Sequence, residues 1–224
     1  MPSIFTTYAP VAAPNSELTL TLLTPLLDDL SHFVFNAHAQ GIPGSLALED
    51  EPNCVAKLVA EQYGSEVHQA LAPNFAPTFF GCSSKPGLNY SVYLMEYLPP
   101  PSHQCEGWMP LSNLRTGFAS SGGVENKIFD VLREIVGCLQ ELNYVHGDLR
   151  SNNLMIKMRN LCSIEDPVVI KVVDFEWAGR VGLARYPEDR NEEVGYPSEA
   201  GAPIGPDDDR EMVEQWVQKQ QAKQ

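Results

Sequence analysis

The chain has 224 residues, a formal net charge of −14 at pH 7 and 43% hydrophobic side chains. This length fits one domain or two small lobes, and the apolar content suffices for a buried core, so wholesale disorder is excluded. The acidic charge argues against nucleic acid and anionic membranes as partners, because both attract clustered lysines and arginines.

The cysteines and the N-terminus favour an intracellular protein. Five cysteines are an odd number without close spacing, which indicates neither a disulfide framework nor a zinc site. The first residues lack the basic start and apolar stretch of a secretion signal, and no apolar run approaches the ~20 residues that span a bilayer. We therefore expect an intracellular, cytoplasmic protein that does not bind membranes.

The first part of the chain predicts β-strands around one short helix. Apolar and β-branched residues dominate the expected strands, which lie at 18–30, 32–38, 54–59, 76–80 and 90–97. A short helix is expected over 65–72, because Gly64 precedes and Pro73 follows this segment.

Three consecutive prolines at 99–101 cannot continue a sheet, since each lacks a backbone donor. They predict a lobe boundary, with an N-lobe at 1–98 that includes the first helix and a C-lobe at 99–224. In the C-lobe, apolar residues at spacings of three and four predict an amphipathic helix over 125–144. Beyond it we expect short strands at 154–158 and 168–173, an irregular segment at 187–209 and a last helix at 210–219.

The strongest local signal is the polar loop after the amphipathic helix. Residues 146–150 read His-Gly-Asp-Leu-Arg, Asn153 follows five positions after Asp148, and Asp174-Phe175-Glu176 ends the second short strand. A helix, loop and strand pair in this order can direct Asp148, Asn153 and Asp174 into one cleft. Their oxygen atoms suit a hard cation such as Mg²⁺, and a phosphoryl-transfer site needs such a metal together with a base for the acceptor hydroxyl.

These motifs resemble the protein-kinase-like superfamily, and in particular a group of kinase-like proteins from fungi. The resemblance implies an α+β, bilobal protein-kinase-like fold with a β-rich N-lobe and a reduced, mainly helical C-lobe. It also implies ATP and Mg²⁺ as cofactors and a hydroxyl-bearing acceptor. In this interpretation Asp148 takes the proton of the acceptor hydroxyl, Arg150 lies near the transferred phosphoryl group, and Asn153 and Asp174 hold Mg²⁺.

The resemblance extends upstream to the nucleotide site. Val55-Ala56-Lys57 resembles the strand with the phosphate-binding lysine, and strand alternation turns Lys57 inward together with its apolar neighbours. Glu66 resembles the helical partner of this lysine, although only nine residues separate them and Glu61 is a rival. The strand at 90–97 resembles the one that leads into the hinge.

In that hinge, backbone groups around Glu96 and Leu98 would contact adenine. Met95 would line the pocket only through the family resemblance, since its simpler interpretation is a core residue.

Several features differ from an ordinary protein kinase. No Gly-x-Gly-x-x-Gly precedes Lys57, and segment 27–32 offers two carboxylates in its place. Glu176 replaces the glycine of Asp-Phe-Gly, and Gly147 replaces the arginine that meets a phosphorylated activation loop, so regulation by loop phosphorylation is not implied. Both replacements resemble small-molecule kinases of the choline and aminoglycoside type.

Only 50 residues follow Asp174, too few for a complete helical C-lobe. The resemblance implies a buried aspartate that braces the catalytic loop, either Asp208 or Asp209. By itself, the acidic run 207–209 is more simply explained as helix capping and compensation of the helix dipole. His146 is expected to brace the loop rather than to react.

Three functions follow from these observations. The leading hypothesis is an ATP- and Mg²⁺-dependent kinase that phosphorylates protein serine or threonine. A small-molecule alcohol as acceptor is the second hypothesis, and a pseudokinase that acts as a binding module is the third.

Overall fold

The computed structural model describes residues 4–8, 17–25, 33–40, 52–84, 89–102, 106–114, 123–158 and 166–222. The chain divides into two compact units, one formed by residues 1–62 and 77–97 and the other by residues 63–76 and 98–224. Residues 63–76 contain the short helix, which the sequence predicts within the N-lobe; its contacts group it instead with the C-terminal residues.

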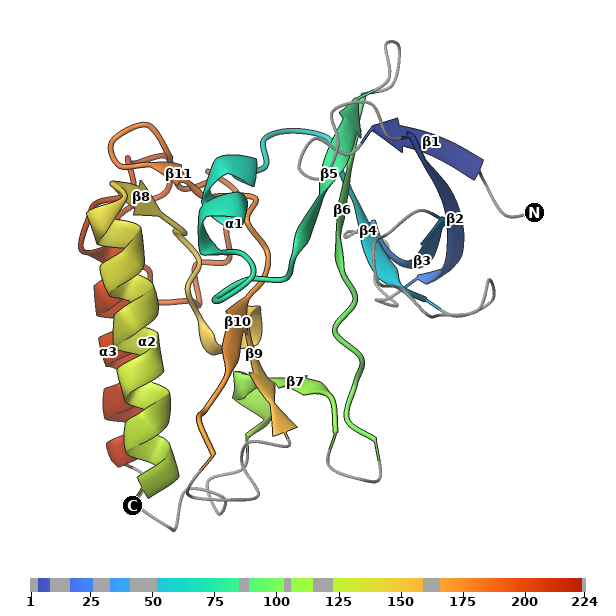
Figure 1. Cartoon of the computed structure of the whole chain (residues 1–224). Helices are drawn as coiled ribbons and strands as arrows, with labels where there is room; N and C mark the ends of the chain where they lie inside the picture. The colour runs from blue at the N-terminus through green and yellow to red at the C-terminus, as the bar shows by residue number, and fades with distance from the viewer. Residues whose placement is uncertain are drawn as a thin grey trace. The chain divides into compact units, whose positions relative to one another are not determined.

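The first unit is one six-stranded antiparallel sheet in the order β1-β2-β3-β4-β6-β5 (Figure 1). Its strands are β1 (Ile4–Tyr8), β2 (Glu17–Pro25), β3 (Val34–Gln40), β4 (Cys54–Val59), β5 (Phe79–Ser84) and β6 (Ser91–Glu96). Strand β1 was not expected, and β5 starts three residues later than the predicted 76–80. Strand β4 has the predicted bounds.

The buried core of this sheet consists of small and branched side chains. The buried cluster consists of Leu20, Ala37, Ala39, Cys54, Ala56, Val92 and Leu94. Just before β4, the Asn53 side chain accepts a hydrogen bond from the Ala39 amide at 2.8 Å and donates one to the Ala39 carbonyl at 3.0 Å. Beyond the start of β4, the Asn53 side chain thus makes the two hydrogen bonds to Ala39 of β3 that a strand backbone would otherwise make.

The described residues of the second unit form three helices and two small sheets (Figure 1). The helices are α1 (Ser65–Leu71), α2 (Gly123–Glu141) and α3 (Asp208–Gln221), with single 3₁₀ turns η1 (Leu111–Asn113) and η3 (Ser151–Asn153). The strands are β7 (Trp108–Pro110), β8 (Tyr144–Val145), β9 (Leu154–Lys157), β10 (Ile170–Val172) and β11 (Gly179–Arg180). They pair as β10-β9-β7 and as β11-β8.

Helix α2 confirms the amphipathic pattern. Ile128, Leu132, Ile135 and Leu139 are all at most 2% exposed and recur every three or four residues. The helix ends before the predicted residue 144, because Asn143 adopts φ 57°, outside the helical region. The short strands β7, β8 and β11 were not predicted, since two or three residues carry no periodicity.

Helices α2 and α3 lie side by side, and the T-shaped contact of Phe129 with Trp216 is part of their interface. Helix α3 is longer at both ends than the predicted 210–219. Within the parts of the chain that the structure describes, no helix has both the length and the apolar character needed to cross a membrane.

Candidate active site

The loop between β8 and β9 brings the predicted catalytic residues Asp148 and Arg150 together with the predicted metal ligand Asn153. Asn153 Nδ2 donates hydrogen bonds to Asp148 Oδ2 at 2.7 Å and to the Asp148 carbonyl oxygen at 3.0 Å. Arg150 Nε lies 3.0 Å from Asp148 Oδ1. Asp148 is only 5% exposed, and each of its two carboxylate oxygens lies against a side chain of the same loop.

Asp209 braces this loop from below. Its carboxylate accepts hydrogen bonds from the His146 amide at 2.6 Å and the Gly147 amide at 2.9 Å, and the residue is 2% exposed. Asp208 instead accepts from Tyr186, Ser198 and Gly205. The capping interpretation is wrong, because the N-cap residue Asp207 makes no side-chain cap bond and its two neighbours bind distant loops.

Two buried carboxyl groups of this site, those of Asp148 and Asp209, have raised pKa values. Burial raises the pKa of Asp209 to about 6, although the His146 and Gly147 amides favour its charged form. Burial also raises the pKa of Asp148 above its usual range; Arg150, Tyr196 and Asn153 oppose this rise, and the nearby charge of Asp174 adds to it. A raised pKa brings a carboxylate closer to the range in which it can accept a proton at neutral pH.

Gly147 is required by the backbone of the loop. It adopts φ +80°, and a Cβ atom there would lie 2.4 Å from Ile204 Cδ1. Any side chain at this position is strained, because L-residues rarely adopt that conformation. The departure from the arginine of many protein kinases therefore has a local structural cause.

His146 has the predicted structural role. It is fully buried, its Nδ1 accepts the Asp148 amide at 3.3 Å and its Nε2 lies 3.2 Å from the Val173 carbonyl oxygen. Its ring makes a T-shaped contact with Phe175, which also stacks in parallel on His68 at 4.5 Å. These rings join the catalytic loop to the Asp-Phe-Glu segment and to α1.

Asp174 follows β10 in a left-handed conformation, with φ 70°. The preceding residue, Val173, donates its amide to the Asn153 carbonyl at 2.9 Å, which brings the two predicted metal ligands close together in the fold. A non-glycine residue with this φ stores strain of about 1–3 kcal/mol, and such residues cluster at functional sites.

The donor atoms near this strained residue fit Mg²⁺. Asn153 uses Nδ2 on Asp148, so its Oδ1 is the atom that a cation would use, and Asp174 adds a carboxylate. Two hard oxygen donors suit Mg²⁺, which keeps waters and binds substrate phosphates as its other ligands. Among the residues that the structure describes, no group of three or more His, Cys, Asp and Glu side chains could hold a metal.

Glu66 lies on α1 within the second unit. Its carboxylate accepts hydrogen bonds from Tyr144 at 3.3 Å and Arg180 at 3.5 Å, and the Arg180 guanidinium covers the Tyr144 ring. Its side chain is 68% exposed. The pairing of Glu66, or of the exposed Glu61, with Lys57 stays a prediction.

Lys57, Met95 and Glu96 belong to the sheet of the first unit. Lys57 is 7% exposed and lies opposite Tyr93 in the β4–β6 ladder. Cys54, Val55, Ala56 and Lys57 are all buried, so β4 is covered on both faces and its burial shows no alternation. Met95 is 8% exposed in β6.

The backbone amide of Glu96 donates to the Thr78 carbonyl at 2.8 Å, and the Glu96 carboxylate accepts hydrogen bonds from the amide and hydroxyl of Thr78. The Glu96 amide is therefore already bonded to the residue that precedes β5. Leu98 is half-buried and is the first residue of the 98–224 part of the second unit. Segment 27–32, where a glycine-rich loop was sought, lies outside the described residues.

One contact of Asp148 was not predicted. The Tyr196 hydroxyl donates a hydrogen bond to Asp148 Oδ1 at 3.0 Å. Burial, with the charge of Asp148, raises the pKa of this hydroxyl, which keeps it a donor. Tyr196 lies in the segment predicted to be irregular, 48 residues after Asp148, and no periodic pattern marks it.

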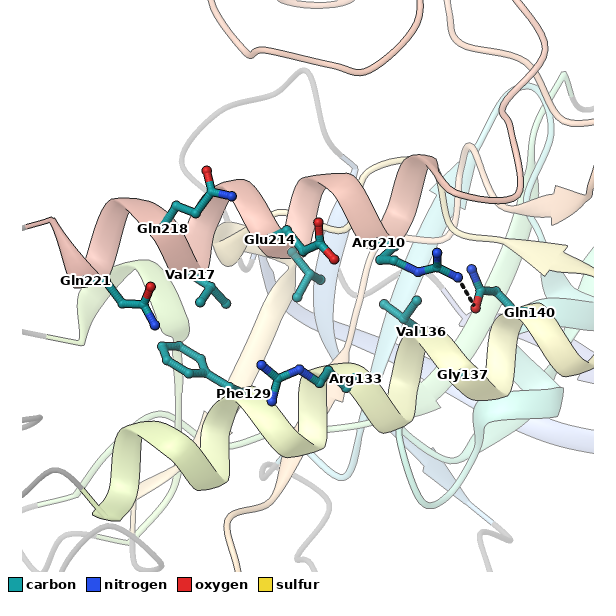
Figure 2. A pocket seen from close by; sticks show the side chains of 11 residues that line it. Phe129, Arg133, Val136, Gly137, Gln140, Arg210, Glu214, Val217, Gln218 and Gln221 are labelled. Carbon is teal, nitrogen blue, oxygen red and sulfur yellow. Dashed lines mark hydrogen bonds between the residues drawn. The ribbon is translucent and has the colours of Figure 1, made fainter.

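The described residues of the second unit line cavities on both sides of α3. One of about 490 Å³ runs between α2 and α3, where Arg210 donates a hydrogen bond to Gln140, and it contains none of the predicted site residues (Figure 2). The other, of about 590 Å³, is lined by Arg150 and Ser151 of the catalytic loop, by Leu111, by Val194 and by Trp216 of α3, among others. The second cavity therefore contacts Arg150, one of the two predicted catalytic residues.

No protein-family model matches the chain, and no curated protein matches its sequence. Among solved structures it is similar to the kinase PK-1 of the Cydia pomonella granulovirus, with a TM-score of 0.57 and 17% sequence identity. The match covers 92% of this chain and 69% of that one. The fold is kinase-like. A likeness at this identity concerns the fold, and the role of each residue rests on the geometry above.

Proposed function

We propose that the chain is a bilobal, ATP- and Mg²⁺-dependent phosphotransferase that transfers the γ-phosphoryl group to a hydroxyl of protein serine or threonine inside the cell. The observation that carries this proposal is the buried Asp148 carboxylate, held by Asn153 and Arg150 beside the strained Asp174. The kinase-like fold supports it.

Each residue has a role in this proposal. Asp148 accepts the proton of the acceptor hydroxyl, and the Arg150 guanidinium stabilises negative charge on the transferred group. Asn153 and Asp174 hold Mg²⁺, which neutralises phosphate charge when it is bound. Lys57 binds the phosphates with Glu66 or Glu61 as its partner, and Met95, Glu96 and Leu98 surround adenine.

The cavity beside Arg150 is the proposed acceptor site. Its lining combines apolar side chains, such as Leu111 and Trp216, with the charged Glu193 and Lys219. A volume of about 590 Å³ is within the range of small-molecule pockets and also admits a few side chains of a polypeptide.

A small-molecule alcohol is therefore the second candidate acceptor. The specific observation in its favour is Gly147, whose φ +80° makes the His-Gly-Asp form of the loop a structural requirement. This form resembles kinases of the choline and aminoglycoside type.

The test is nucleotide binding followed by transfer. Thermal unfolding is measured with and without Mg-ATP on the wild type, on Asp174→Ala and on the matched control Asp130→Ala, which alters an exposed aspartate of α2. A ligand at about 100 times its Kd adds about 2.7 kcal/mol of stability, which raises Tm by roughly 5–10 °C for a chain of this size. We expect this rise in the wild type and the control and its loss in Asp174→Ala.

Transfer is then measured with radiolabelled ATP on dephosphorylated casein, choline and kanamycin. Label on casein supports the protein kinase, and label on either small molecule supports the second candidate. A Tm rise without transfer to any acceptor, or no rise at all, contradicts the phosphotransferase and leaves the pseudokinase.

A further inference from the structure

The Tyr196 hydroxyl completes the set of groups on the Asp148 side chain. Oδ1 receives the Tyr196 hydroxyl at 3.0 Å and lies 3.0 Å from Arg150 Nε, and Oδ2 receives Asn153 Nδ2 at 2.7 Å. A carboxylate offers about four lone-pair sites. The hydrogen bonds from Tyr196 and Asn153 occupy two of these sites, and Arg150 adds an ion pair to Oδ1 without a hydrogen bond from Nε. The carboxylate can therefore still accept from a further donor, such as an acceptor hydroxyl.

Tyr196 is itself held by its ring. The ring packs against Trp177 and Tyr186 at centroid distances of 5.4 and 5.5 Å. The Arg190 guanidinium lies 4.8 Å from the centroid of Tyr196 and 4.5 Å from that of Tyr186, and it also donates to the Ser198 carbonyl. These contacts do not involve the hydroxyl, so the ring stays in place if the hydroxyl is removed.

The neighbouring Tyr186 offers a comparison within the same cluster. Its hydroxyl donates to Asp208 Oδ2 at 3.1 Å, and Asp208 has no proposed part in the chemistry. The two tyrosines thus differ in which carboxylate they orient, while their rings share the same surroundings.

We propose that Tyr196 is a positioning residue for Asp148. The hydroxyl of Tyr196 fixes the Asp148 carboxylate in the orientation that receives the acceptor hydroxyl. This inference rests on the proposed phosphotransferase function. The segment 187–203, which has no helix or strand, acts through this hydroxyl on the catalytic loop. Asn153 fixes Oδ2 and Tyr196 fixes Oδ1, so the carboxylate cannot rotate about its last bond without losing one of them.

The kinetic test is Tyr196→Phe, with Tyr186→Phe as the matched control. A lost hydrogen bond to a charged group corresponds to about a tenfold fall in kcat for Tyr196→Phe. The KM for ATP should stay unchanged, because the contact is on the acceptor side of Asp148. Tyr186→Phe should lower Tm and leave kcat unchanged. Wild-type kcat in Tyr196→Phe overturns the inference, and so does a rise in kcat, which would mean that the hydroxyl blocks the acceptor.

A second measurement does not depend on turnover. Urea-denaturation midpoints are compared for the wild type, Tyr196→Phe, Asp148→Ala and the double variant. We expect the double variant to shift the midpoint by less than the sum of the single shifts, because both single variants remove the same interaction. Additive shifts overturn the inference. A wild type that neither binds nor turns over Mg-ATP overturns the proposed function, and with it any catalytic role of Tyr196, even if the midpoints are coupled.

Discussion

The charge of Asp209 should make the stability of the protein fall as pH rises through about 6. Burial raises the pKa of this carboxyl to about 6 from its ordinary value of 3.8. The folded state therefore favours the protonated form, and the contribution of this group to stability is complete below pH 3.8 and is lost as pH rises through the folded pKa. A difference of about two pH units corresponds to about 3 kcal/mol.

The test is the comparison of wild type with Asp209→Asn, which cannot titrate. The free energy of unfolding is measured by urea denaturation from pH 4 to pH 8, followed by tryptophan fluorescence. We expect the wild type to lose about 3 kcal/mol relative to Asp209→Asn between pH 4 and pH 7. Asp189→Asn, at an exposed position, controls for the loss of one negative charge.

A constant difference between wild type and Asp209→Asn would refute this reasoning. A wild type that gains relative stability with rising pH would mean that the two amide donors from His146 and Gly147 outweigh burial, and that the folded pKa is lowered.

Three further predictions concern other parts of the fold. Asp148→Ala should abolish phosphoryl transfer and keep the Tm rise with Mg-ATP, because its role is toward the acceptor; transfer at the wild-type rate would contradict that role. Gly147→Ala should lower the free energy of unfolding by about 1–2 kcal/mol through its left-handed backbone, with a further cost from the contact with Ile204, and a variant as stable as the wild type in urea would refute this account. Asn53→Ala should cost about 1–2 kcal/mol in the same assay, because the Ala39 amide and carbonyl both lose a partner; an unchanged midpoint would show that water replaces the side chain.

The elements that were predicted are those whose own residues carry a local signal, such as a periodic pattern, β-branched residues or flanking Gly and Pro. The spacing of Ile128, Leu132 and Ile135 marks the buried face of α2, whereas β4 is buried on both faces, so alternation alone does not explain the burial of Lys57. Strands of two or three residues, such as β8 and β11, depend on pairing between distant segments, which no local pattern records.

The candidate site follows the same division. Asp148, Arg150 and Asn153 lie within six residues, so a motif could name them together. Tyr196 contacts Asp148, and Asp209 contacts the amides of the same loop, each from a segment distant in sequence. Only the fold shows these contacts. The acidic run 207–209 was misjudged because capping is the commoner local role of aspartate before a helix, and tertiary contacts override it here.

The brace by Asp209 also determines when the site can form. Its two hydrogen bonds to His146 and Gly147 span 63 and 62 residues of sequence. During synthesis the loop amides have no such partner until the first turn of α3 has emerged and closed this long loop, which is a slow, entropically costly step. We therefore expect the loop at 146–153 to be among the last parts of the second unit to reach its final geometry. A partly synthesised chain would contain the His-Gly-Asp motif before Asp209 holds its backbone in place.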